Sequence, residues 1–236
     1  AGFTLSWGMA LMLFGALNIV TGNLLALRQR QVKRLLAYSS MSQIGYILLG
    51  LGIGLYVGES IGIQGGLFHL LNHGLMKGLA FFCAGAVLYA IGRVNGNEHS
   101  LTIDDLAGLA RRYPLLALAF TLALLSLGGV PPLAGFMSKW QILVAGLGTG
   151  TGWIDLLVIF AALNSVLSLG YYLPVMNALF RDEPSLAVQH GRALPLAVWL
   201  PLVILAAALL LVGLWPNAVT WLTQPAAAGL LAAFGG

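Results

Sequence analysis

Long apolar runs separated by short polar segments dominate this sequence. The runs cover residues 7–27, 35–56, 67–91, 113–127, 153–180, 194–214 and 216–234. About 20 helical residues span the hydrocarbon core of a bilayer, so the longer runs predict transmembrane α-helices. The last run is alanine-rich and interrupted by Pro225, which predicts a short span or an interfacial helix. We therefore expect an all-α, polytopic transmembrane bundle of six or seven segments.

One segment, residues 128–135, interrupts this pattern with the sequence GGVPPLAG. Pro131 and Pro132 remove two backbone donors, and the flanking glycines relax the backbone. An interrupted helix at membrane depth is tolerated where it is buried in protein or lines a hydrated cavity, and half-helix ends expose groups that hold ions or water. The segment predicts a broken helix inside the bilayer; an ordinary turn between two spans is the alternative.

The composition supports the membrane assignment and limits the function classes. The chain is 59% hydrophobic and 8% charged, whereas soluble domains carry about 25% charged residues. The net charge of +4 does not indicate nucleic-acid binding, because the basic residues are few and confined to short loops. Charge counting places the loops 28–34 and 92–112 on one side, the cytoplasmic one, with Glu59 opposite. We expect a multi-pass protein of a bacterial or archaeal cytoplasmic membrane, in preference to an organelle inner membrane.

Three ionisable residues lie inside the run 67–91. His69, His73 and Lys77 are spaced i, i+4 and i+8, which stacks them within about 80° of one helix face over about 12 Å. A lysine at the centre of a span costs about 2.5–3.5 kcal/mol on insertion scales, and intramembrane ionisable residues mark proton relays. Histidine titrates near neutral pH. The row predicts a proton relay; the alternative is a helix anchored to its neighbours by hydrogen bonds.

Further polar groups accompany this row. Lys139 lies four residues after the interrupted segment. It is a second intramembrane lysine if the break lies inside the bilayer, or a snorkelling lysine if the segment is an ordinary turn. The run 35–56 begins with hydroxyl and amide groups that either carry water or bond neighbouring helices: Tyr38, Ser39, Ser40, Ser42 and Gln43. Four glycines in the same run, at positions 45, 50, 52 and 54, predict close helix packing.

Several chemistries are excluded. The sequence holds no GxxxxGK[ST] loop, no GxGxxG after a strand and no HExxH, and the single Cys83 permits no disulfide within the chain and predicts a small core side chain. No carboxylate lies deep in an apolar run, so the chain offers no negatively charged ligand for Na⁺ inside the membrane. Asp155 lies near an expected helix start and is assigned as a cap, and Tyr171 and Tyr172 are placed in the interfacial aromatic belt.

Four segments occur in a recognisable order: KRLLAYSSMSQIGY at 33–46, FHLLNHGLMK at 68–77, DLAGL at 105–109 and LGGVPPLAGFMSK at 127–139. Together they resemble the antiporter-like subunits shared by respiratory complex I, Mrp-type cation/proton antiporters and membrane-bound hydrogenases. The resemblance covers residues 18–174. It implies a family fold of about fourteen helices with two inverted repeats, each holding one broken helix. This chain would carry the second repeat, with its break near Pro131 and Pro132.

The resemblance also assigns roles. Lys77 would be the central lysine of a relay, His69 and His73 its hydrated neighbours, and Lys139 the terminal lysine. The family's first repeat, with its glutamate–lysine pair, would precede Ala1. We therefore expect a portion of a larger subunit, a split gene or a degenerate relative. The resemblance places the loop after residue 91 outside the cell, opposite to the charge count.

We expect a proton-translocating, non-redox subunit of a redox-driven complex of the NADH-quinone oxidoreductase or hydrogenase type. Residues 1–184 would form the conducting module and residues 185–236 the C-terminal helices. No cofactor is expected in this chain; quinone, FMN and iron–sulfur clusters or a NiFe centre would lie in partner subunits. The partners would be other hydrophobic antiporter-like subunits, a peripheral redox arm and membrane lipid. The alternatives are a subunit of an Mrp-type Na⁺/H⁺ antiporter and a structural membrane subunit that has lost transport.

Overall fold

The computed structural model describes residues 6–92 and 100–234, and these residues are predominantly helical. Within them no strand forms; one isolated bridge pairs Gln31 with Thr102. The prediction of an all-α fold is confirmed. Besides the long helices, four short elements occur in loops: η1 (Asp104–Leu106), α4 (Leu109–Arg112), α8 (Leu186–Gln189) and η2 (Pro216–Val219).

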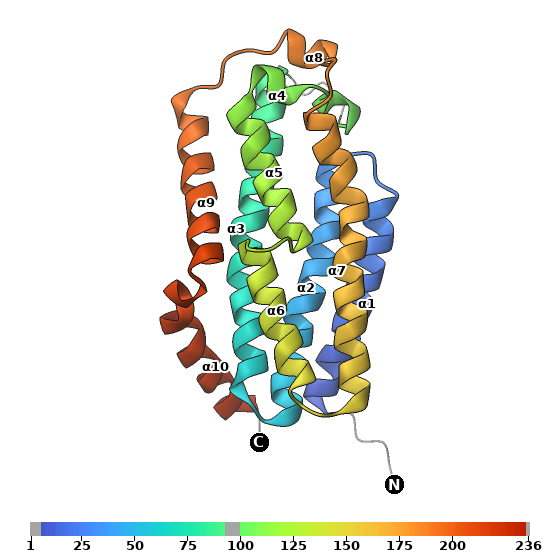
Figure 1. The fold of residues 1–236 in the computed structure, drawn as a ribbon, viewed down its shortest axis with the longest axis vertical. Coiled ribbons are helices and arrows are strands. Elements are labelled where there is room, and N and C mark those ends of the chain that lie inside the picture. The colour runs from blue at the N-terminus through green and yellow to red at the C-terminus, as the bar shows by residue number, and fades with distance from the viewer. Residues whose placement is uncertain (1–5, 93–99, 235–236) are drawn as a thin grey trace.

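The long helices stand side by side as an elongated bundle (Figure 1). Five are long and apolar enough to cross a membrane: α1 (Trp7–Leu27), α2 (Val32–Val57), α3 (Ser60–Ala90), α7 (Gly152–Leu179) and α9 (Leu196–Leu214). α5 (Pro114–Gly128) and α6 (Ala134–Leu147) follow one another end to end and together make a further crossing (Figure 1). α10 (Thr220–Phe234) lies below α9 along the lower part of α3 and adds no separate crossing (Figure 1). The described residues therefore hold five candidate spans and the interrupted pair α5 and α6, which agrees with the lower of the two predicted numbers.

Glycines bring the backbones of α1, α2 and α3 into direct contact. A Cβ atom added at Gly45 would lie 2.5 Å from the carbonyl oxygen of Gly15 on α1. A Cβ atom at Gly50 would lie 2.9 Å from the Cα atom of Gly66 on α3. Gly52 and Gly54 are equally close to the backbones of α1 and α3. The prediction that these glycines permit close packing is confirmed, because any side chain would force the helices apart.

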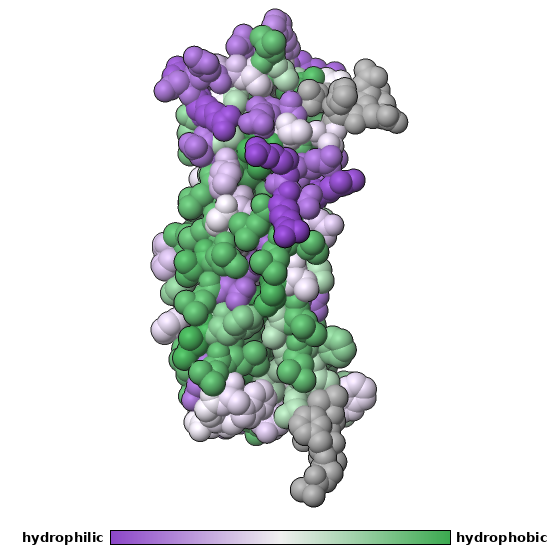
Figure 2. Space-filling view, turned by 90° about the vertical axis from the view of Figure 1, so that its right-hand side faces the viewer, coloured by the Kyte–Doolittle hydropathy of each residue, from purple (hydrophilic) through white to green (hydrophobic). Residues whose placement is uncertain are grey.

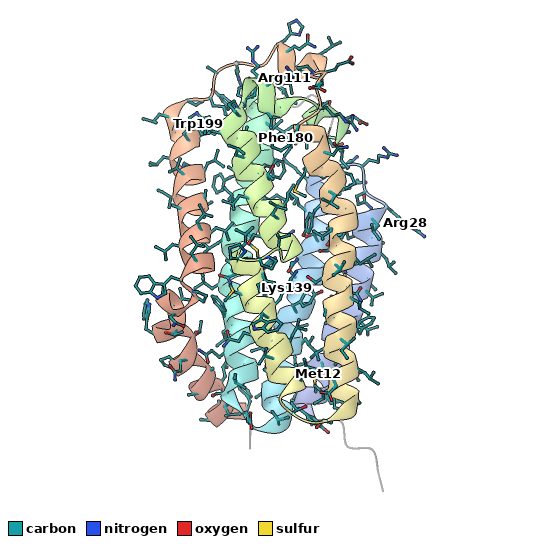
Figure 3. The ribbon with its side chains drawn as sticks, in the orientation of Figure 1. Met12, Arg28, Arg111, Lys139, Phe180 and Trp199 are labelled. Carbon is teal, nitrogen blue, oxygen red and sulfur yellow. The ribbon has the colours of Figure 1, made fainter. Side chains whose placement is uncertain are left out.

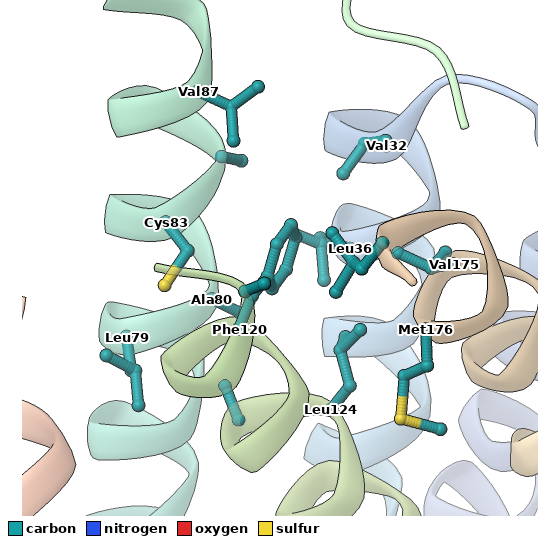
Figure 4. Close-up of a cluster of buried hydrophobic side chains, with 14 of the residues drawn as sticks. Val32, Leu36, Leu79, Ala80, Cys83, Val87, Phe120, Leu124, Val175 and Met176 are labelled. Atoms are coloured by element: carbon teal, nitrogen blue, oxygen red, sulfur yellow. The ribbon is translucent and has the colours of Figure 1, made fainter. Parts of the chain in front are cut away.

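The main hydrophobic core lies between α2, α3, α5 and α7 (Figure 4). Phe120 of α5 is fully buried between Leu36 of α2 and Cys83 of α3 (Figure 4). The Cys83 side chain is fully enclosed, which agrees with its prediction as a small core residue. This packing fixes α5, and with it the position at which α5 ends.

Charged loops collect at one end of the bundle. Figure 2 shows hydrophilic residues at this end and a hydrophobic surface over the middle. The α1–α2 loop pairs here with the segment before η1, where Val32 N donates to Leu101 O at 2.8 Å. Ion pairs join Arg111 to Asp182 and Arg181 to Asp104. The loop 28–34 and the described part of 92–112 therefore share one end, as predicted, and Glu59 lies at the other (Figure 1); residues 93–99 lie outside the described residues.

Two predictions about α7 are wrong. Tyr171 and Tyr172 are 3% and 0% exposed and face the bundle interior, so they do not belong to an interfacial belt. They lie about two turns before the end of α7, because the helix continues through Pro174 to Leu179. At the other end of α7, Asp155 lies in the first turn, so its predicted position near a helix start is confirmed, but the N-cap is Thr151 and the predicted capping role is wrong.

Candidate functional site

The crossing formed by α5 and α6 is interrupted midway along the bundle (Figure 1). α5 ends at Gly128 and α6 begins at Ala134, with Pro131 and Pro132 in the connection, joined by a cis peptide bond. The ends of the two half-helices stay in contact, because Gly135 N donates to Ser126 Oγ at 3.1 Å. Of the last four carbonyls of α5, those of Leu125 and Ser126 accept from Val130 N and Gly129 N, and those of Leu127 and Gly128 accept side-chain donors.

Lys139 of α6 lies beside this helix end, at mid-height in the bundle (Figure 3). Its Nζ donates to Leu127 O at 2.9 Å and to Ser165 Oγ of α7 at 2.9 Å, and it lies 4.8 Å from the centre of the Tyr46 ring. The side chain is 4% exposed, so it does not snorkel toward a membrane surface. The partial negative charge at the carboxyl end of α5 favours a cation at this point.

His69 of α3 connects to the same carbonyl through one amide. Its Nε2 lies 3.0 Å from Gln43 Oε1, and Gln43 Nε2 donates to Leu127 O at 3.0 Å. Its Nδ1 lies 2.8 Å from Ser138 Oγ of α6. The Leu127 carbonyl thus accepts from both Lys139 and Gln43, which links His69 to Lys139 through residues of four helices, α3, α2, α5 and α6.

The hydrogen-bond network assigns the protons of His69. Because Gln43 donates to Leu127 O, its carbonyl oxygen faces His69 Nε2, which must carry a hydrogen. Nδ1 of the neutral ring then accepts from the Ser138 hydroxyl. That hydroxyl also lies 3.1 Å from Ala134 O and can turn to it. His69 can therefore take up a proton at Nδ1 through the rotation of one hydroxyl group.

Lys77 of α3 forms a second group of polar contacts. Its Nζ donates to Leu36 O and to Ser39 Oγ of α2, both at 2.7 Å. The Ser39 hydroxyl is in turn hydrogen-bonded to the Tyr172 hydroxyl of α7. The Lys77 side chain is 6% exposed, so this ammonium group is enclosed by protein and bonded to neutral oxygens.

His73 lies between the two groups, one helical turn from His69 and one from Lys77. The ring is half-buried, and its Nε2 is buried without a hydrogen-bond partner among the residues that the structure describes. The Tyr172 side chain also has a hydrogen-bond contact with Gln43, so the Lys77 group and the Lys139 group meet at Tyr172 as well. The four predicted residues are thus brought together along one path, in which His73 occupies the middle position.

Only some members of the hydroxyl and amide cluster of α2 contact the lysine and histidine groups. Ser39 and Gln43 contact the lysine and histidine groups, as described above. Ser40 donates to Leu36 O within its own helix at 3.1 Å, and Ser42 is buried with its Oγ unpartnered in the described part of the chain. Tyr38 is partly buried against the main core. Two of the five predicted supporting residues therefore take part in the site.

The sequence interpretation missed the contribution of α7. Ser165 and Tyr172 bond the Lys139 and Lys77 groups, and the neighbouring Tyr171 donates to Asn23 Oδ1 of α1 at 2.9 Å. The polar positions of α7 follow helical spacing and mark one inward face: Asn164, Ser165, Ser168, Tyr171 and Tyr172. This periodicity was the signal that could have identified them.

A pocket of about 330 Å³ reaches Lys139 from the side of the bundle. It is lined by the broken segment at Gly129 and Pro131, by Ser165 of α7, and by Trp140, whose side chain is half exposed. Lys139 is therefore accessible from the surface on which α6 and α7 lie. Within the described residues no group of three His, Cys, Asp or Glu side chains could hold a metal ion.

Curated relatives share most of this chain. F(420)H(2) dehydrogenase subunit N of Methanosarcina mazei is 33% identical over 94% of this chain and 44% of that protein. NADH-quinone oxidoreductase subunit N 2 of Syntrophobacter fumaroxidans is 36% identical over 94% of this chain and 44% of that protein. The chain thus spans less than half the length of these relatives.

Solved membrane complexes contain chains of the same fold. A chain of the Mrp complex from Dietzia sp. matches 98% of this chain and 49% of its own length, with a TM-score of 0.81 and 25% identity. A chain of respiratory complex I from Thermus thermophilus with bound NADH matches 96% of this chain and 45% of its own length, with a TM-score of 0.78 and 28% identity. The family model described as NADH:quinone oxidoreductase/Mrp antiporter, TM, matches residues 2–168. This integral membrane protein therefore belongs to the family of transmembrane subunits of NADH:quinone oxidoreductases and Mrp antiporters.

Proposed function

We propose that this chain conducts protons through the membrane as a subunit of a redox-driven complex of the NADH-quinone oxidoreductase type. The observation that carries the proposal is the pair of buried lysines, Lys77 and Lys139, whose described partners are neutral carbonyls and hydroxyls. Removing one member of a buried ion pair leaves an uncompensated charge. These lysines can lose a proton without leaving such a charge behind.

In this mechanism Lys77 and Lys139 alternate between the charged and neutral forms. A proton leaving Lys77 passes through water to His73, whose Nε2 has no other partner among the described residues. It then passes to Nδ1 of His69 and through water to Lys139. Gln43 and Leu127 O hold His69 and Lys139 in a fixed relation. A charge change on a neighbouring subunit shifts the proton affinities of the two lysines and gives the transfer its direction.

Electrons would travel outside this chain. Quinone, FMN and iron–sulfur clusters, or a NiFe centre, would belong to partner subunits that include a peripheral redox arm and further antiporter-like subunits. We assign the conducting role to residues 1–184 and a packing role to the C-terminal helices in residues 185–236. The relatives named above come from bacteria and an archaeon, which favours a prokaryotic cytoplasmic membrane. The basic end of the bundle would face the cytoplasm.

The test is proton pumping by the whole complex in sealed vesicles. Lys77→Ala and Lys139→Ala should abolish pumping and leave membrane insertion intact. Lys33→Ala is the matched control, because Lys33 is an exposed lysine at the basic end and should pump normally. Pumping at wild-type stoichiometry in both buried-lysine variants would refute the proposal.

An Mrp-type Na⁺/H⁺ antiporter subunit is the second candidate, favoured by the TM-score of 0.81 to the Mrp complex. Mass spectrometry of the proteins that copurify in mild detergent separates the two. Iron–sulfur and quinone-reactive partners support the redox-driven complex, and hydrophobic subunits alone support the antiporter. A structural subunit without transport would tolerate replacement of His69, His73, Lys77 and Lys139 together.

A further inference from the structure

An apolar groove runs between the upper halves of α3 and α9. Its volume is about 460 Å³, and it is lined by Phe82, Gly85 and Tyr89 from α3 and by Val198 and Pro201 from α9. α9 stands at the outer edge of the bundle (Figure 1), with much of its surface facing outward. The groove is therefore an indentation in the hydrophobic exterior, parallel to the helices.

A cation is fixed at the upper mouth of this groove. Arg192 N donates to Ala90 O at 2.8 Å, and Arg192 Nε donates to Tyr89 O at 2.8 Å. The guanidinium carbon lies 3.9 Å from the centre of the Tyr89 ring. The Tyr113 hydroxyl donates to Arg192 O at 2.9 Å. The backbone and Nε are thus anchored, and the terminal amino groups of Arg192 have no partner among residues 6–92 and 100–234.

A second groove provides an internal comparison. It lies between α5 and α9, has a volume of about 470 Å³, and is also apolar. The arginine beside α5, Arg112, uses both terminal amino groups, one toward Gln189 O at 2.6 Å and one toward Gly191 O. The two grooves are therefore alike in size and apolar lining. They differ in their arginines: among the described residues, the terminal amino groups of Arg192 beside the α3–α9 groove have no partner, whereas those of Arg112 are bonded.

We propose that the α3–α9 groove binds an anionic phospholipid, with its phosphate on the Arg192 guanidinium and an acyl chain along Gly85. Arginine binds phosphate through paired N–H donors, and basic pockets at the cytoplasmic ends of transmembrane helices bind anionic headgroups. Tyr89, which contacts the Arg192 guanidinium, lines the groove, and the groove continues from it along α3 to Gly85 and Phe82. An acyl chain attached to a phosphate at Arg192 would therefore lie in the groove. This inference is independent of proton transfer, because no residue of the lysine and histidine path lines the groove.

Gly85 allows the groove to be filled without disturbing the protein. A Cβ atom added at Gly85 has no other heavy atom within 4 Å, so a leucine there would extend into the groove. Gly74 provides the matched control, because it lies on the same helix, also has open space at its Cβ position and does not line the groove. Both substitutions place the same side chain on the exterior of α3.

The experiment measures lipid retention by the purified whole complex. The complex is stripped of lipid in mild detergent, incubated with phosphatidylglycerol or phosphatidylcholine, and examined by native mass spectrometry. The wild type and Gly74→Leu should retain phosphatidylglycerol, and Arg192→Lys, which keeps the charge but loses the paired donors, should retain it to an intermediate degree. Gly85→Leu and Arg192→Gln should each weaken this retention about tenfold, and phosphatidylcholine should be retained weakly by all five forms.

Two results would overturn the inference. One is equal retention of phosphatidylglycerol by the wild type and Gly85→Leu. The other comes from a photoreactive phenylalanine at position 85 in the whole complex: its capture of a protein helix instead of a lipid would mean that a partner subunit fills the groove. Assembly of each variant is checked on a native gel, and Gly85→Leu tests the site even if Arg192→Gln fails to assemble.

Discussion

Gly135 holds the two half-helices of the broken crossing against each other, and Gly135→Ala is a sharp test of the site. A Cβ atom at this position would lie 2.8 Å from the carbonyl carbon of Ser126 and 2.9 Å from Met76 Sδ, and would clash with the Ser126 carbonyl oxygen as well. The Ser126 atoms belong to the backbone of α5. They cannot rotate away, so α6 must shift relative to α5.

The structure gives a lower limit for this shift. Ordinary van der Waals contact begins at 3.4 Å, so the contact with the Ser126 carbonyl carbon alone requires a movement of at least about 0.6 Å. A shift of that size along the bond lengthens the Lys139 Nζ–Leu127 O distance from 2.9 Å to about 3.5 Å, the limit of a hydrogen bond. This bond positions the Lys139 ammonium group for proton transfer, and a misplacement near 1 Å can cost about 100-fold in rate.

We therefore expect Gly135→Ala to reduce proton pumping by roughly 10- to 100-fold, while quinone reduction by the proposed redox-driven complex falls less. The assay compares the pumping rate with the rate of the driving reaction in the same vesicles. Gly152→Ala is the control, because a Cβ atom at Gly152 meets no atom within 4 Å. Normal pumping by Gly135→Ala in a normally assembled complex would refute the link between the helix junction and the lysine.

Two further predictions compare hydroxyl groups that differ in their contacts. Ser39→Ala removes one of the two acceptors of Lys77 and should slow pumping about tenfold, since a lost bond to a charged group costs about 1.5–3 kcal/mol. Ser40→Ala removes a hydroxyl that bonds its own helix and should pump normally. Equal pumping rates in the two variants would contradict this prediction. Tyr172→Phe removes the partner of Ser39 and should slow pumping several-fold, whereas Tyr38→Phe should have no effect; a pumping defect in Tyr38→Phe alone would reverse the assignment.

The sequence predicted the elements of this fold because they depend on local chemistry. Runs of apolar residues must be helical in a membrane, since each backbone group needs an internal partner. Two adjacent prolines among glycines must interrupt a helix wherever they lie. The spacing of His69, His73 and Lys77 fixes their common face from helix geometry alone. These inferences needed no knowledge of which helices are neighbours.

The partners of these residues could not be derived in the same way. Ser138 and Ser165 contact His69 and Lys139 because α6 packs beside α3 and α7 packs beside α6. Which helices become neighbours depends on tertiary packing and not on local chemistry. Tyr172 was placed at a membrane surface because tyrosine near the end of a span is typical of that region. The rule fails here because α7 continues for about two more turns beyond it.

The neutral surroundings of Lys139 determine how strongly a neighbouring charge can act on it. The carboxyl end of α5 stabilises the ammonium group by about 0.3–1 kcal/mol, and by about 2 kcal/mol at most. A unit charge about 10 Å away, at an effective dielectric constant of about 20, contributes about 1.7 kcal/mol. One charge in a neighbouring subunit therefore matches the whole effect of the helix end and changes the protonation equilibrium more than tenfold. A carboxylate bonded to Lys139 would outweigh that signal. Under the proposed function, the absence of a carboxylate partner among its described contacts would leave this lysine responsive to a charge in a neighbouring subunit.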